Sequence, residues 1–390
     1  MNNFRFIALV SFLFLSFVVA RADDGSGKSG FNPLTVGVPS LTIAPDARAG
    51  AMGDVGVATD PDIFSQFWNP AKYAFAYSKA GIGLSYTPWL RSLISDIDLA
   101  YLAGYYKLGD SDRHAIGASL RYFSLGEIAM YDWYGDPITA TNPYEMSFDV
   151  GYSLKLTENF SGAATFRFIY SDLGAGLEDM EPGVSWAADV AGYYNKYVML
   201  GNSECLLGLG FNVSNIGTKI SYDFDNTSNF LPTNLRLGGS LLLPMDDYNT
   251  LSLNLDVNKY LIPTPPSTEN MTAEEKQTAL EDYFAISPIS GMFKSFNDAP
   301  GGMKEEFQEI MWSFGAEYAY DQKFFVRGGY FYENPNKGNR QYFSLGAGFK
   351  MTSFQMDVAY LISTVPSNPL DQTLRFSLSF DMDGLRMLTR

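Results

Sequence analysis

The sequence has 390 residues, a formal net charge of −16, 18% charged residues and 46% hydrophobic residues. That much apolar content excludes a disordered protein, and so acidic a chain would be repelled by a phosphate backbone, which excludes nucleic acid as a partner. One cysteine (Cys205) and one histidine (His114) leave almost no room for a disulfide framework, a zinc cluster or a His-based catalytic site. The 25 Tyr, 30 Phe and 36 Gly favour a β-rich protein.

The N-terminus has the pattern of an export signal. Arg5 supplies the positive charge, residues 6–19 are apolar apart from two serines, and A-R-A at 20–22 is a cleavage motif. We therefore expect residues 1–22 to be a signal peptide. No later apolar run is long enough for a membrane-spanning helix, so the pattern leaves a soluble exported protein or an outer-membrane β-barrel.

From residue 80 onward, apolar and polar residues alternate with the period of a β-strand. Leu374, Phe376 and Leu378, for example, alternate with Arg375 and Ser377. The predicted strands have about 8–11 residues, which suits a tilted strand crossing a membrane, and their number is even, as in bacterial single-chain barrels. They lie at 80–87, 97–106, 114–123, 145–155, 161–171, 184–194, 205–213, 234–242, 250–258, 311–320, 324–332, 341–350, 354–362 and 372–381.

Long and short connections between these strands alternate along the chain. An outer-membrane barrel has long outer loops and short periplasmic turns, whereas a soluble sandwich has no reason to sort its connections in this way. Arg167, Arg236 and Arg375 are each flanked by apolar residues, so they must face the lumen while their neighbours face lipid. The fold class predicted is all-β: a 14-stranded antiparallel transmembrane β-barrel at residues 80–390.

Two segments do not read as strands. Residues 23–79 contain five prolines and many glycines, and we expect them to form a plug, with residues 31–79 folded inside the barrel. The long outer loop 259–310 contains a capping box at Thr272 and Glu275, which predicts a helix over 271–284, and a second short helix is expected at 302–310. Loops this long usually have a function, so we expect contact with a partner or ligand rather than a mere cap.

A recognisable pattern occurs at residues 40–76. The run P-D-A-R-A-G-A-M-G-D-V-G-V-A-T at 45–59 is followed by W-N-P-A-K-Y-A-F at 68–75. This resembles the plug of the FadL-like outer-membrane barrels and, more closely, the PorV family of the type IX secretion system. The plug-motif residues carried by the resemblance are Arg48, Gly50, Gly53, Asp54, Asn69 and Pro70.

The resemblance implies a FadL-like barrel with an N-terminal plug, located in the cell outer membrane. It implies a non-enzymatic shuttle for protein secretion that binds the C-terminal signal domains of cargo at a very large translocon barrel (SprA/Sov-like). The shuttle then passes cargo to a surface attachment complex that contains a PorU-like sortase. The implied partners are therefore this translocon, the cargo domains, the sortase complex and outer-membrane lipid. The alternative is a FadL-like transporter of hydrophobic solutes.

Candidate site residues outside the plug are aromatic and apolar. Tyr131, Trp133 and Tyr134 lie in one predicted outer loop, and Trp89 and Leu90 lie in the first. They are either a protein-binding patch or part of the aromatic girdle at the membrane interface. No catalytic residue, cofactor or metal is expected, and His114, near the periplasmic rim, is expected to be a solvated turn residue.

Overall fold

The computed structural model describes residues 32–91, 96–109, 112–131, 134, 136–174, 181–222, 228–266, 271–366, 368 and 370–382. The predicted signal peptide, the first residues of the predicted plug and Trp133 lie outside these ranges. No described helix has the length and apolar character needed to cross a membrane.

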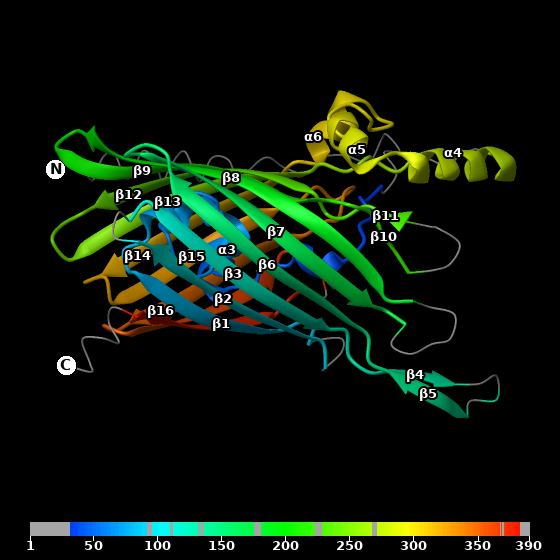
Figure 1. Ribbon diagram of the computed structural model, residues 1–390, viewed down its shortest axis with the longest axis horizontal. Coiled ribbons are helices and arrows are strands. Elements are labelled where there is room, and N and C mark those ends of the chain that lie inside the picture. The colour runs from blue at the N-terminus through cyan, green and yellow to red at the C-terminus, as the bar shows by residue number, and fades with distance from the viewer. Residues whose placement is uncertain are drawn as a thin grey trace. The chain divides into compact units, whose positions relative to one another are not determined.

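Fourteen antiparallel strands close into a barrel (Figure 1). Strand β1 pairs with β18, for example Leu84 with Leu378, and so closes the ring. In chain order the barrel strands are β1 (Ala80–Pro88), β2 (Asp98–Leu108), β3 (His114–Ser124), β6 (Tyr144–Lys155), β7 (Phe160–Asp172), β8 (Gly183–Leu200), β9 (Ser203–Gly217), β12 (Asn234–Pro244), β13 (Asn249–Tyr260), β14 (Met311–Tyr320), β15 (Phe324–Tyr332), β16 (Gln341–Lys350), β17 (Phe354–Ser363) and β18 (Leu374–Asp381).

The two faces of the wall differ as the alternation requires. Along β7, Phe166 is exposed on the outside while Arg167 is buried on the inside, and β18 repeats the pattern with Phe376 and Arg375. Arg236 on β12 is buried as well. An apolar outer face with charges turned inward is the arrangement that contact with lipid requires. The predicted lumenal position of these three arginines is confirmed.

Each of the fourteen predicted strands is present, with small differences at the ends. The largest difference is at β8 and β9, which run on into a ribbon joined by a turn at Gly201 and Asn202, where Gly201 has φ +63°. The connection after β3, predicted as a loop, contains a hairpin of β4 (Ile128–Tyr131) and β5 (Pro137–Thr141). A further short pair, β10 (Ile220–Ser221) and β11 (Ser228–Asn229), lies between β9 and β12.

The connection between β13 and β14 carries three helices, which appear in yellow in Figure 1. They are α4 (Ala273–Ala285), α5 (Pro288–Lys294) and α6 (Met303–Gln308). Helix α4 begins at the predicted capping box, in which Thr272 and Glu275 bond each other's backbone N–H groups. Helix α6 lies within the second predicted range, and α5 was not predicted.

The segment before β1 is compact and almost wholly buried. It contains η1 (Pro39–Thr42), α2 (Ala47–Gly50), α3 (Ser65–Trp68) and η2 (Pro70–Phe75). We call residues 32–79 the inner segment, because their side chains and backbone contact the inward-facing residues of the strands. Ala47 N, for example, donates to Ser377 Oγ on β18 at 2.8 Å, and Ser161 on β7 donates to Ala71 O at 2.7 Å.

Candidate functional site

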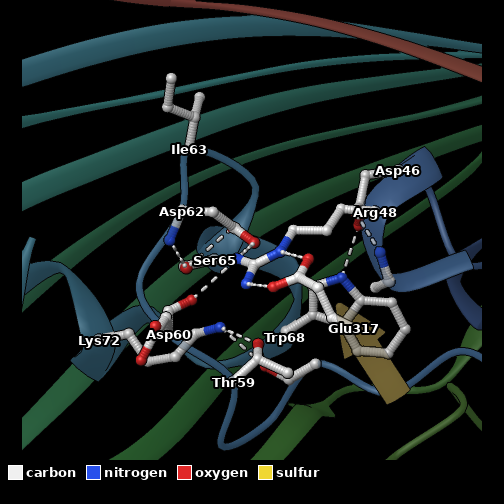
Figure 2. A network of polar contacts seen from close by, with 12 residues as sticks. Asp46, Arg48, Thr59, Asp60, Asp62, Ile63, Ser65, Trp68, Lys72 and Glu317 are labelled. Atoms are coloured by element: carbon white, nitrogen blue, oxygen red, sulfur yellow. Dashed lines mark hydrogen bonds and ion pairs between the residues drawn. The ribbon is translucent and has the colours of Figure 1, made fainter. Parts of the chain in front are cut away.

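The inner segment is joined to the barrel wall by buried ion pairs centred on Arg48 (Figure 2). From α2, Arg48 donates to both carboxylate oxygens of Glu317 on β14, at 3.1 and 3.0 Å, and to Asp62 within the inner segment at 3.0 Å. Glu317 also accepts from Arg327 on β15 at 2.5 Å, and Arg327 reaches Asp357 on β17 at 2.6 Å. This series of alternating charges therefore links Arg48 to three strands of the wall, β14, β15 and β17.

Asp46 organises the start of α2. Its carboxylate accepts from Ala49 N at 2.9 Å, which caps the helix, and from Trp68 Nε1 on α3 at 2.6 Å. Burial, together with the nearby charge of Asp62, raises the pKa of the Asp46 carboxyl to about 6 in spite of these hydrogen bonds. One side chain thus fixes two short helices of the inner segment against each other.

The turn at residues 56–59 is held from both sides. Asp256 on β13 accepts from Gly56 N at 2.7 Å and from Val57 N at 2.9 Å. From the other side, Lys72 on η2 donates to Gly56 O at 2.8 Å and to Thr59 Oγ1 at 3.1 Å. Burial lowers the pKa of Lys72, because the charged ammonium loses hydration there. The Asp256 contacts fix the turn to the wall, and the Lys72 contacts fix it within the inner segment.

The remaining plug-motif residues are also in contact with the wall. Asp54 accepts from Arg375 on β18 at 2.6 Å and from the Tyr342 hydroxyl at 2.5 Å. Asn69 caps η2, which begins at Pro70, and donates to Gly192 O on β8 at 3.0 Å. The structure therefore places these motif residues in contact with inward-facing residues of the strands.

Glycines on the inner face let the two backbones approach closely. A Cβ on Gly329 would lie 2.0 Å from the carbonyl carbon of Met52, and one on Gly315 would lie 2.6 Å from Met52 O. On the motif side, Gly53 has φ +72° and packs on the Tyr330 backbone, while Gly50 packs on the Arg375 side chain. Small residues at these positions are what allow the inner segment to fit.

Two adjoining cavities lie where the inner segment meets the base of the long loop. The smaller has a volume of about 30 Å³ and is lined by Phe67, Trp68 and Arg236 among others. The larger has a volume of about 220 Å³ and is lined by Pro33, Leu34 and Val36 of the inner segment. They share Thr42, Tyr260 and Arg340 as lining residues, so the two cavities lie next to each other.

The long loop is fastened to the barrel rim by a buried charge cluster. Lys259, at the end of β13, donates to Glu306 at 3.1 Å and to Glu309 at 2.5 Å. Lys337, in the connection between β15 and β16, donates to Glu305 at 2.5 Å and to Glu309 at 3.0 Å. Although burial opposes ionisation of Glu305, its hydrogen bond to Lys337 keeps the pKa of that carboxyl below its usual value. Helix α6 and the residue after it are thereby tied to the end of β13 and to the β15–β16 connection.

Beyond this anchor, the loop presents apolar side chains to solvent. Phe293 is 76% exposed and Phe307 is 66% exposed. We call the set the α5–α6 surface; it consists of Ile289, Phe293, Phe296, Met303 and Phe307. Large apolar side chains gathered on one anchored loop are typical of a protein-interaction site.

The predicted outer-loop residues are placed differently from one another. Trp89 and Leu90 are half-buried and pack against the apolar cluster formed by Ile43, Ile97, Leu99 and Phe123. Tyr131 ends β4, and Tyr134 is 90% exposed. Their role in protein binding stays a prediction. His114, at the start of β3, is half-buried and bonds the Tyr152 hydroxyl at 2.5 Å.

Sequence reasoning missed the α5–α6 surface. It identified the loop as functional but chose aromatics in other loops. The signal that could have found it is the spacing of Ile289, Phe293 and Phe296 on a segment that starts with Ser287 and Pro288, which is a helix-start pattern.

Comparisons with known proteins agree with the barrel and the motif. The family model described as "Type IX secretion system protein PorV" matches residues 27–267. Among solved structures, the Pseudomonas putida toluene transporter TodX is 11% identical with a TM-score of 0.50, covering 86% of this chain and 97% of its own. A Pseudomonas aeruginosa FadL homologue is 11% identical with a TM-score of 0.42, covering 90% and 100%. No curated protein matched. At such low identity the likeness to TodX shows the fold alone.

Proposed function

This chain belongs to the PorV family of the type IX secretion system and is an outer-membrane β-barrel; from that premise we propose that it is a non-enzymatic shuttle for secreted proteins. It binds the C-terminal signal domains of cargo at the translocon barrel and delivers them to the surface complex that contains the sortase. The observation that carries the proposal is the α5–α6 surface.

The α5–α6 surface suits protein binding because it is both apolar and held in place. Phe293, Phe307 and Met303 are each more than half exposed, and burying such side chains against a partner would contribute about 1.5–3 kcal/mol each. The ion pairs of Lys259 and Lys337 fix the loop before a partner arrives. A preformed surface loses less conformational freedom on binding, which favours affinity.

The contacts of the inner segment with the wall support binding at the outside of the barrel rather than passage through the lumen. We propose that the inner segment acts as a plug. Arg48, Asp54 and Asn69 bond the wall from its inside, and Asp256 reaches back from the wall to the segment. Opening a path through the lumen would require breaking several buried ion pairs at once.

The surroundings of His114 support a role without catalysis. Its ring bonds Tyr152, and it lies at the strand end away from the long loop. A hydrolase of the serine type needs its base beside a nucleophile and a third group that orients the base.

The test is affinity purification of the tagged protein from its native outer membrane. The wild type should recover a very large barrel and signal-bearing cargo. The double variant Phe293→Ser and Phe307→Ser should lose most of both while the barrel remains folded. Tyr248→Ser is the matched control, because Tyr248 is an exposed aromatic in the turn between β12 and β13, at the other end of the barrel.

Two outcomes would contradict the proposal. The first is undiminished recovery by the double variant. The second is a deletion strain that secretes and processes its cargo normally while failing to take up a hydrophobic solute. That second outcome would favour the transporter of hydrophobic solutes, the alternative implied by the FadL-like resemblance.

A further inference from the structure

The outward face of β3 runs across the whole apolar band of the wall. Its residues are, in order, His114, Ile116, Ala118, Leu120 and Tyr122. Tyr122, at the end that also carries the long loop, stacks on Tyr144 of β6 with the ring centroids 5.6 Å apart. An outer-membrane barrel has an apolar band flanked by aromatic girdles at both membrane interfaces. His114, at the opposite end of β3, therefore lies at the level of the periplasmic girdle.

Two tyrosines mark the same level on the neighbouring strands. Tyr106 on β2 and Tyr152 on β6 both pair with Ile116 in the register of the sheet, and they are 50% and 44% exposed. The Tyr152 hydroxyl and Nδ1 of His114 share a hydrogen bond of 2.5 Å. A polar pair is thus placed at the edge of an apolar outer face, which is the depth at which lipid headgroups meet the hydrocarbon.

Arg113, the residue before β3, adds a positive charge beside this pair. Its Nε and Nη2 donate to Lys155 O, at 3.3 and 3.1 Å, while the residue remains exposed. The neighbouring carboxylate of Asp112 is paired with Lys107 at 3.3 Å. Among the residues that the structure describes, no carboxylate forms an ion pair with Arg113. The guanidinium is thus oriented by the backbone and keeps donors available for an anion.

A lipid phosphate suits these groups better than a soluble anion does. Arginine matches phosphate oxygens with its planar donors, and the aromatic level of the wall is the level of the headgroups. Toward the middle of the membrane, Ile116 and Leu120 are exposed and offer apolar contacts for acyl chains. We propose that Arg113 and the His114–Tyr152 pair bind the phosphodiester group of a glycerophospholipid in the periplasmic leaflet. Its acyl chains lie along Ile116 and Leu120. This site is independent of the shuttle role.

The test compares two lipids with identical acyl chains, dioleoylphosphatidylglycerol and dioleoylglycerol, of which the second lacks the phosphate. Full-length protein in a non-ionic detergent is titrated with each lipid, and native mass spectrometry measures the affinity of the first lipid bound. The phosphatidylglycerol should bind at least about fivefold more tightly, because one basic residue near a membrane surface contributes about that factor toward an anionic lipid. Equal affinity for the two lipids overturns the proposal without any variant.

The deacylated headgroup, glycerophosphoglycerol, distinguishes a lipid from a soluble phosphodiester. An excess of this compound should leave the bound phosphatidylglycerol in place, because it has no chains to pack on Ile116 and Leu120. Displacement of the lipid by the headgroup alone would show that the site takes a soluble anion, and it would overturn the assignment to lipid.

Two variants then locate the site. Arg113→Gln should weaken phosphatidylglycerol binding by about fivefold and leave dioleoylglycerol binding unchanged. Lys350→Gln is the matched control, because Lys350, at the end of β16, is also an exposed cation at the turn end of the barrel and has no ion pair within the described ranges. It should bind the lipid as the wild type does. Heat-modifiable migration in dodecyl sulfate gels verifies that each variant is folded. Weaker binding in both variants alike, or in neither, would refute the assignment to Arg113.

Discussion

At the scale of single residues, Arg48 of the sequence motif connects the inner segment to the barrel wall. Its guanidinium is shared between Asp62 of the inner segment and Glu317 of the wall, and Glu317 is shared in turn with Arg327. Removing the Arg48 cation would leave the buried Glu317 with Arg327 alone as its ion-pair partner and would leave Asp62 without its ion pair. Breaking a buried ion pair from one side is far more harmful than never having formed it.

We therefore expect Arg48→Gln to destabilise the docked inner segment by about 3–5 kcal/mol. The measurement is the midpoint of urea unfolding of the protein in lipid vesicles, followed together with protease cleavage within residues 32–79. Lys323→Gln is the control, because the pair of Lys323 with Asp321 is exposed in the turn between β14 and β15. That control should behave as the wild type. A wild-type midpoint for Arg48→Gln would contradict the role assigned to the Arg48 ion pairs.

Two neighbouring glycines on β15 provide a second test at this scale. A Cβ at Gly329 would meet the Met52 backbone, whereas a Cβ at Gly328 would meet Leu345 Cδ2 at an ordinary 3.6 Å. Gly329→Ala should cost about 1–3 kcal/mol through overpacking and loosen the inner segment, while Gly328→Ala should be nearly neutral. Thermal unfolding of the two variants side by side checks this, and similar losses for both would count against close packing of the inner segment on β15.

At the scale of elements, the strands were predictable and the contents of the connections were less so. The period-2 pattern of β18, with Leu374, Phe376 and Leu378 facing out, is imposed by lipid on one side and a polar lumen on the other, so the sequence carries it directly. The capping box of α4 is equally local, because Thr272 and Glu275 bond each other. Such features can be read from neighbouring residues alone.

What could not be read from the sequence depends on residues far apart in the chain. Nothing local to Arg48 indicates Glu317, which is 269 positions away. Likewise, Trp89 is half-buried because Ile43 of the inner segment and Phe123 of β3 pack beside it, contacts that no periodicity reveals. The extension of β8 and β9 was missed although its signals are local, because the apolar run at 197–200 leads into a Gly-Asn turn at 201–202.

The loop anchor gives the prediction at this scale. Glu309 accepts from Lys259, Lys337 and Thr264 and is buried. Glu309→Gln should weaken the anchor by about 1–3 kcal/mol, because two ammonium groups lose a shared carboxylate. Trypsin should then cut more rapidly at Lys294 and Lys304. Glu274→Gln, on the exposed face of α4, is the control, and unchanged cleavage in Glu309→Gln would show that the charge cluster does not hold the loop.

At the scale of the whole molecule, the closed barrel and the inner segment predict how the protein behaves in a membrane. The wall has no unpaired edge, because β1 and β18 pair along Gly81–Tyr86 and Phe376–Asp381. Reconstituted in planar bilayers, the wild type should pass little current if the inner segment is the plug that we propose. A variant lacking residues 32–79 should conduct, provided that it folds, which its migration in unheated dodecyl sulfate gels would verify. Steady large currents through the wild type would contradict the proposed plug.

The contacts of Ala47 and Asp54 with β18 bear on the order of assembly. Ser377 and Arg375 belong to β18, the last strand among the described residues, yet they bond residues 330 and 321 positions earlier in the chain. The inner segment therefore lacks these contacts until β18 has paired with β1. Closing the seam and seating these early residues are thus coupled, and a chain truncated before β18 would lack both.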